Sequence, residues 1–217
     1  VFRRLRTSHN PKDLLEVARW GVREMGRAFA RTNSSALASV RCGAGCAYCC
    51  HVPVAVQAHE IFLAAEYIKV TCPPADLPEL VRKTEAHKAR VSGLEGAEYI
   101  NLVLACSLLK DGKCSIYEAR PEVCRAHHAN DPTICEAALS DSGLVQSAYI
   151  VSLRSRMFGV MLGIDQAFAQ AGYDGRAYDF CSALHEALTD GQRILDWSTK
   201  KQAFSDESRE PPLTPGG

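Results

Sequence analysis

Apolar residues recur at helical spacing along most of this 217-residue chain. Asn10 and Pro11 suit a helix cap and a first-turn proline, and an apolar stripe then runs from Leu14 to Phe29. The same period predicts four further helices, over residues 55–70, 76–90, 142–168 with a cap at Ser142, and 177–188. The pattern therefore predicts a mainly α fold, with one helical domain over residues 1–204.

One short segment, residues 108–117, is not helical in pattern. It consists of two runs around Asp111-Gly112, which is a strong signal for a β-hairpin. A two-residue turn would pair Leu109 with Cys114 and place Cys106 and Cys114 on opposite faces. A three-residue loop with Gly112 in the left-handed region would place both thiols on one face, and we expect this register if both bind one metal centre.

Composition narrows the function classes. Lys plus Arg and Asp plus Glu number 25 each, so no net field would attract nucleic acid or anionic lipid. We expect no membrane span, because no apolar run is long enough, and a cytoplasmic protein, because the cysteine density is below that of secreted disulfide scaffolds. The polar, proline-rich residues 205–217 predict a disordered tail.

Ten cysteines carry the strongest chemical signal. Four lie within nine residues, at Cys42, Cys46, Cys49 and Cys50, and this crowding suits a soft metal or an iron-sulfur cluster better than disulfides with each other. Further cysteines follow at Cys106, Cys114, Cys124 and Cys135. Cys124 lies near the start of a short helix predicted from Pro121 to about His127, where backbone amides and Arg125 would stabilise a thiolate.

These two cysteine segments resemble the bacterial cysteine-cluster proteins described as a zinc- or iron-chelating domain. The resemblance rests on the pattern CxxxCxxCC at residues 42–50 and on the run from Cys106 to Arg125, and it covers about residues 42–135. It implies that eight cysteines act as metal ligands: Cys42, Cys46, Cys49, Cys50, Cys106, Cys114, Cys124 and Cys135. Flagellin lysine methylases are similar in their cluster, which implies that the motif is open to iron-sulfur chemistry.

The identity of the metal stays open between a 4Fe-4S cluster and Zn²⁺. Eight thiolates would make two closed zinc sites, or one cluster with four thiols left for a second ion. Cys49 and Cys50 are adjacent and are expected to point in different directions, which favours two centres; we favour iron-sulfur narrowly. The spacing of Cys42, Cys46 and Cys49 also matches radical enzymes that use S-adenosylmethionine, but the chain lacks the alternating strands of their βα barrel.

Other polar residues have simpler interpretations. Cys72 and Cys181 lie outside the pattern and are expected to be ordinary thiols. Three histidines flank the cysteine segments and are expected to face solvent rather than bind metal: His51, His127 and His128. His59 and Glu60 suggest an acid–base pair, but a solvated polar face is favoured. For Arg120 and Arg125, a role beside thiolates and a place on the exposed surface are equally supported.

These observations predict a cysteine-ligated metalloprotein that acts in electron transfer or as an accessory to a partner protein or modification enzyme. Two alternatives remain. One is a non-catalytic interaction module stabilised by zinc, and the other is an S-adenosylmethionine-dependent iron-sulfur enzyme of methyltransferase type. The residues identify no catalytic group and do not decide whether the chain is an enzyme.

Overall fold

The computed structural model describes residues 2–43, 45–140 and 149–211, and within them the chain is mainly α, as predicted. Its helices are α1 (Phe2–Thr7), α2 (Pro11–Ala30), α3 (Ser34–Leu37), α4 (Ala58–Thr71), α5 (Leu77–Val91), α6 (Gly96–Ile100), α7 (Glu122–Ala126), α8 (Pro132–Ser140), α9 (Val151–Gln170), α10 (Phe180–Thr189) and α11 (Gln192–Ser198). Short 3₁₀ turns are η1 (Tyr48–His51), η2 (Tyr117–Ala119) and η4 (Asp206–Ser208). The strands are β1 (Ala55–Gln57), β2 (Leu109–Lys110), β3 (Lys113–Cys114) and β4 (Ala177–Asp179). The helix cap expected at Ser142 lies outside the described residues.

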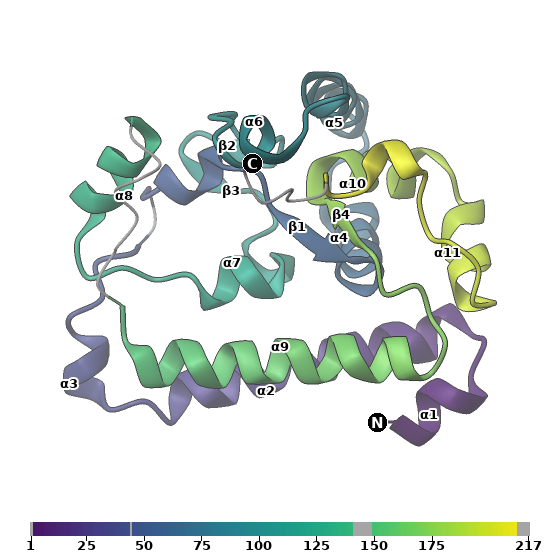
Figure 1. Ribbon diagram of the computed structural model, residues 1–217, viewed down its shortest axis with the longest axis horizontal. Helices are drawn as coiled ribbons and strands as arrows, with labels where there is room; N and C mark the ends of the chain where they lie inside the picture. The colour runs from purple at the N-terminus through teal and green to yellow at the C-terminus, as the bar shows by residue number, and fades with distance from the viewer. Residues whose placement is uncertain (1, 44, 141–148, 212–217) are drawn as a thin grey trace.

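Two long helices, α2 and α9, run antiparallel along one side of the molecule (Figure 1). The α2 helix begins as predicted, with the side chain of Asn10 accepting a hydrogen bond from the backbone of Lys12 at 3.0 Å. Leu14 is fully buried on its inner face, whereas Phe29, at the far end of the stripe, is 47% exposed. Because α2 precedes the cysteine segment and α9 follows it, their packing brings together the parts of the chain on either side of that segment.

A small sheet that the sequence pattern did not indicate joins two distant parts of the chain. Strand β1 pairs antiparallel with β4, with Val56 opposite Tyr178. Each strand leads directly into a helix, so the ladder fixes where α4 and α10 begin. The residues predicted to start helices at 55 and 177 are therefore strand residues.

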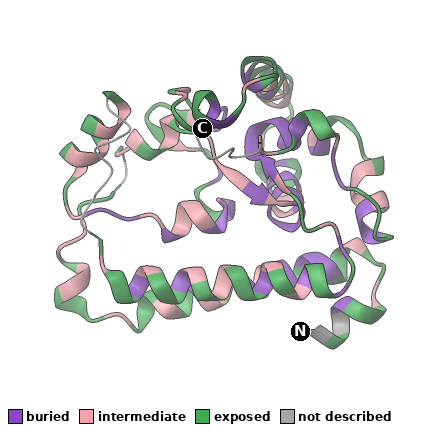
Figure 2. Cartoon of the chain, in the orientation of Figure 1, coloured by how far each residue is buried: buried purple, intermediate pink, exposed green. Residues whose placement is uncertain are grey.

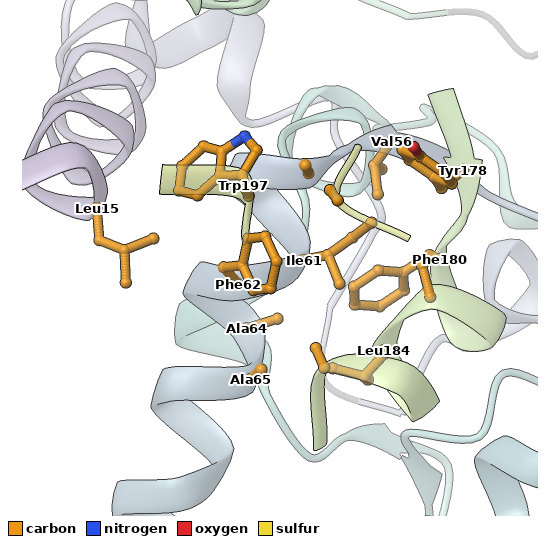
Figure 3. Packing of buried hydrophobic residues seen from close by; sticks show 14 of the residues in the cluster. Leu15, Val56, Ile61, Phe62, Ala64, Ala65, Tyr178, Phe180, Leu184 and Trp197 are labelled. Carbon is orange, nitrogen blue, oxygen red and sulfur yellow. The ribbon is translucent and has the colours of Figure 1, made fainter. Parts of the chain in front are cut away.

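The hydrophobic core lies between α4, α10 and α11, where the buried segments concentrate (Figure 2). Figure 3 shows Ile61 and Phe62 of α4 facing Phe180 and Trp197. The rings of Phe62 and Trp197 have centroids 5.1 Å apart, and both side chains are almost fully buried. Full burial of side chains of this size is worth about 2 kcal/mol each, so this cluster anchors the first residues of α4.

The hairpin forms, but its register differs from the expected one. Leu109 pairs with Cys114, and Asp111 and Gly112 are the two turn residues, both with positive φ, at 51° and 71°. Two positive φ values define a type I′ turn, which suits the strand twist better than the three-residue loop. This register was expected to place Cys106 and Cys114 on opposite faces of the hairpin, but Cys106 lies outside the strand. A turn separates it from β2, closed by the Leu109 N–H, which donates to the Cys106 carbonyl at 2.9 Å.

The predicted disordered tail does not begin at Ser205. The Glu186 carboxylate accepts hydrogen bonds from the Ser205 backbone at 3.0 Å and from the Ser208 hydroxyl at 2.6 Å. Arg209 forms a β-bridge with Tyr178, so residues 205–211 pack on the helices, while residues 212–217 lie outside the described part. The end of the predicted domain at residue 204 is therefore too early. In the described ranges, no helix has both the length and the apolar character needed to cross a bilayer.

Candidate metal centre

Three parts of the chain meet the cysteine loop at residues 41–51, and backbone hydrogen bonds fix two of them. The Cys106 N–H donates to the Cys50 carbonyl at 2.7 Å, which places these two residues side by side. On the other flank, the Ala129 N–H donates to the Cys42 sulfur at 3.2 Å. Helix α8, which carries Cys135, packs on η1. Residues separated by as many as 93 positions, from Cys42 to Cys135, are thus brought to one region.

The thiols form two neighbouring groups, according to which of them raise one another's pKa. Burial raises the pKa of Cys42 and Cys135, and nearby sulfurs raise both values further. These sulfurs define the outer group: Cys42, Cys46, Cys49 and Cys135. Burial likewise raises the pKa of Cys114 and Cys124, which belong with Cys50 and Cys106 to the inner group. The sulfur of Cys106 raises both pKa values further, and so does that of Cys49 from the outer group. All eight predicted ligands therefore lie in one region, and all ten cysteines are free thiols.

Cys49 and Cys50 join the two groups. The two thiols influence each other, which raises the pKa of Cys49 and lowers that of Cys50. Cys49 also raises the pKa of thiols in both groups, such as Cys42 and Cys124. The expectation that Cys49 and Cys50 serve two centres stays a prediction.

The sulfurs within each group are spaced more widely than a mononuclear zinc site requires. In a tetrahedral site with Zn–S bonds of about 2.3 Å, the sulfurs lie about 3.8 Å apart. In the part of the chain that the structure describes, no three cysteines have sulfurs all within 4.8 Å of one another. Zinc binding would therefore require the loops to close inward.

A single arginine supplies positive charge to both groups. The Arg120 guanidinium counteracts the rise in pKa of Cys42, Cys49 and Cys114. Its Cζ lies 3.6 Å from the ring centroid of Tyr117, which holds the guanidinium in place. Arg125, the cation expected beside Cys124, instead donates to the Arg120 carbonyl at 3.0 Å and so braces the backbone.

The flanking histidines have structural partners. His128 is buried, with Nδ1 3.0 Å from the Ala126 carbonyl and Nε2 accepting from the Ile150 N–H at 2.9 Å. Both ring nitrogens are thus engaged, and the expectation that His128 faces solvent is wrong. His51 Nδ1 lies 3.0 Å from the Ala47 carbonyl, which leaves it half-buried within η1. Burial lowers the pKa of His127, and this favours its neutral form.

Cys181, expected to be an ordinary thiol outside the pattern, lies against the inner group. Its sulfur is 3.8 Å from that of Cys106, and it is buried at the start of α10. This contact lowers the pKa of Cys106 and raises that of Cys181. No local signal distinguished Cys181 from a core cysteine, because the contact depends on the pairing of β1 with β4.

Comparison with known proteins gives one family. Residues 41–142 match the CxxCxxCC family, described as "Putative zinc- or iron-chelating domain". No curated protein and no solved structure matches the chain, so the likeness to flagellin lysine methylases stays a prediction. The first cysteine spacing here, Cys42-Gly-Ala-Gly-Cys46, has one residue more than the family name spells. The matched range includes all eight predicted ligands and ends before α9, so the similarity to this family covers the part of the chain that lies between the two long helices in sequence.

Proposed function

We propose that four of the eight clustered thiols bind an iron-sulfur cluster of the 4Fe-4S type and that the protein acts in electron transfer or as a redox accessory to a partner enzyme. The observation that carries this proposal is the convergence of the inner and outer groups around Arg120. Four thiolates on one centre carry excess negative charge, and a nearby guanidinium offsets it. The N–H of Ala129, directed at the Cys42 sulfur, would stabilise a metal-bound thiolate further.

The sulfur spacing favours a cluster over single zinc ions. Each thiolate of a 4Fe-4S cluster binds a different iron atom, so the ligand sulfurs need not approach as closely as around one ion. The inner group suits the cluster better, because Cys106 and Cys124 are more shielded from solvent than Cys42 and Cys49. When bound, such a cluster supplies one-electron redox chemistry.

The protein's own contribution would be to hold and tune that centre. The contact of Cys181 with Cys106 adds a hydrogen bond to a ligand sulfur, which raises the reduction potential of iron-sulfur centres. The outer group lies near the surface, with Cys42 and Cys49 exposed, and gives a partner protein a short path to the centre. The balanced charge supports a protein partner rather than nucleic acid.

Anaerobic purification with iron, sulfide and zinc analysis tests the proposal directly. We expect iron and acid-labile sulfide, a brown protein, and an absorption band that bleaches on reduction. Cys124→Ser and Cys50→Ser should lose most of the iron. Cys72→Ser, whose thiol lies outside both groups, should keep it. A colourless protein with zinc in all preparations would refute the redox role and support the alternative of a zinc-stabilised interaction module.

The third alternative, a radical enzyme that uses S-adenosylmethionine, receives no support from the fold. Within residues 2–43, 45–140 and 149–211, the sheets are two antiparallel pairs, β1–β4 and β2–β3. Such enzymes bind substrate in a barrel of parallel strands. The cysteine spacing alone therefore does not carry that activity.

A further inference from the structure

A second group of potential ligands lies between α4 and α9, beside the inner thiol group, since Glu60 is close enough to Cys124 to raise its pKa. His59 Nε2 is 3.7 Å from Asp165 Oδ1, and ligand atoms of His59, Glu60 and Asp165 all lie within 4.8 Å of one another. His59 and Glu60 are 1% and 6% exposed, so the solvated face expected for them is wrong. This group is a buried cluster of one imidazole and two carboxyls.

Several polar atoms of this cluster have no hydrogen-bond partner. His59 Nε2 and Asp165 Oδ1 are both buried and unpartnered, and so is Glu122 Oε2 at the start of α7. Buried polar atoms in folded proteins are nearly always satisfied, so three such atoms in one place indicate a missing partner. The ring of His59 stacks on Phe168, with centroids 4.6 Å apart, and this packing fixes the direction of its unpartnered nitrogen.

The carboxylates are held in position by the backbone. Glu60 accepts a hydrogen bond from the Glu122 N–H at 2.6 Å. The carboxyl of Glu122 fills a notch at Gly21 of α2, where an added Cβ would lie 2.8 Å from Oε1. Contacts from α2, α4 and α7 thus hold these two carboxyls in position.

Burial also affects the ionisation of the three side chains. Burial raises the pKa of Glu60 and of Asp165 and lowers the pKa of His59. Burial therefore disfavours the charged form of all three side chains. A cation between them would satisfy all three groups at once.

We propose that His59, Glu60 and Asp165 bind one divalent first-row transition metal ion, such as Mn²⁺ or Fe²⁺, through a donor set that contains no cysteine. The donor set is one imidazole nitrogen and carboxylate oxygens, which suits these ions and contrasts with the soft thiolate sites. Glu122 supplies a further carboxylate beside the site. The side chain of Asp165 is 16% exposed, and this exposed edge gives an ion its entry path.

Mn²⁺ is the appropriate probe, because thiolates bind it weakly and carboxylates bind it well. The full-length protein, purified anaerobically with its thiol centre intact, is titrated with Mn²⁺ near pH 7.5, and free Mn²⁺ is followed by its electron paramagnetic resonance signal. We expect one bound ion per chain, with ¹⁴N coupling from the imidazole of His59.

Asp165→Asn and His59→Gln should each weaken Mn²⁺ binding by at least tenfold. Glu66→Gln is the matched control, because Glu66 lies on the same helix but is paired with Arg19 at the surface. It should bind Mn²⁺ like the parent protein. Absence of tight Mn²⁺ binding in the parent, or equal binding in Asp165→Asn and His59→Gln, would overturn the proposal. If a variant does not fold, the parent spectrum decides, since bound Mn²⁺ without ¹⁴N coupling also overturns it.

Discussion

Replacing Gly21 by alanine tests whether the notch in α2 is needed by its neighbours. A Cβ there would lie 2.8 Å from Glu122 Oε1 and 2.9 Å from Ile164 Cγ1. Ile164 is 2% exposed and cannot move aside freely. Overpacking of this kind costs about 1 to 3 kcal/mol, whereas alanine gains about 1 kcal/mol over glycine in a helix. The net expectation is a loss of up to about 2 kcal/mol of unfolding free energy.

Gly26 on the same helix provides the matched comparison. No atom lies within 4 Å of a Cβ built at Gly26, so Gly26→Ala keeps the helix gain and stabilises by about 1 kcal/mol. The difference in unfolding free energy between Gly21→Ala and Gly26→Ala therefore measures the cost of overpacking, about 1 to 3 kcal/mol. Urea unfolding with parallel thermal scans measures it, and for a chain of this size 1 kcal/mol corresponds to about 2 to 4 °C. Equal stabilisation by both alanines would show that the notch is not occupied and would contradict the packing described for Glu122.

Three further predictions concern the turn, the C-terminal segment and the thiol region. Gly112→Val should cost about 1 to 2 kcal/mol because φ at Gly112 is positive, whereas Gly43→Val, at ordinary φ, should leave the thermal midpoint nearly unchanged. Burial alone would raise the pKa of Glu186, but hydrogen bonds from the 205–208 segment lower it to about 2. The stability that Glu186 contributes is complete above the unfolded pKa near 4.3 and is lost as the pH falls toward 2. Glu186→Gln should therefore lower the free energy of unfolding by about 2 kcal/mol at pH 7, and this difference from the parent should disappear in acid. Arg120→Gln should lower metal occupancy more than Arg125→Gln, as read by metal analysis after mild chelation; equal losses would refute the assigned role of Arg120.

The long helices and the cysteine motif were predictable because their signals are local. The cap at Asn10 and the stripe from Leu14 are contained within one helix, and the spacing of Cys42 to Cys50 is contained within one loop. The turn at Asp111-Gly112 was also visible, although the register expected for it was wrong. Asp-Gly itself favours the two-residue type I′ turn that forms, and the other register was expected only so that Cys106 and Cys114 could share a face.

What escaped prediction depends on pairing across the chain. Strands β1 and β4 have three residues each and lie about 120 positions apart, so neither carries an alternating pattern long enough to detect. His59 resembled a surface residue because the groups that bury it, Phe168 and Asp165, come from α9. Cys181 meets Cys106 for the same reason. A polar residue in the local sequence pattern is therefore not always exposed, because a distant segment of the chain can bury it.

The α2–α9 pair also determines how the chain tolerates changes in length. These helices close a loop of roughly 120 residues, from Ala30 to Val151, that contains the whole family domain. Closure entropy grows only with the logarithm of loop length, so ten added residues cost less than about 0.1 kcal/mol. Insertions in exposed turns of this segment therefore add almost nothing to the entropy cost of closing the loop. They are restricted instead by the geometry around the thiols. The same long closure gives the native state a high contact order, so we expect folding to be slow for a helical protein.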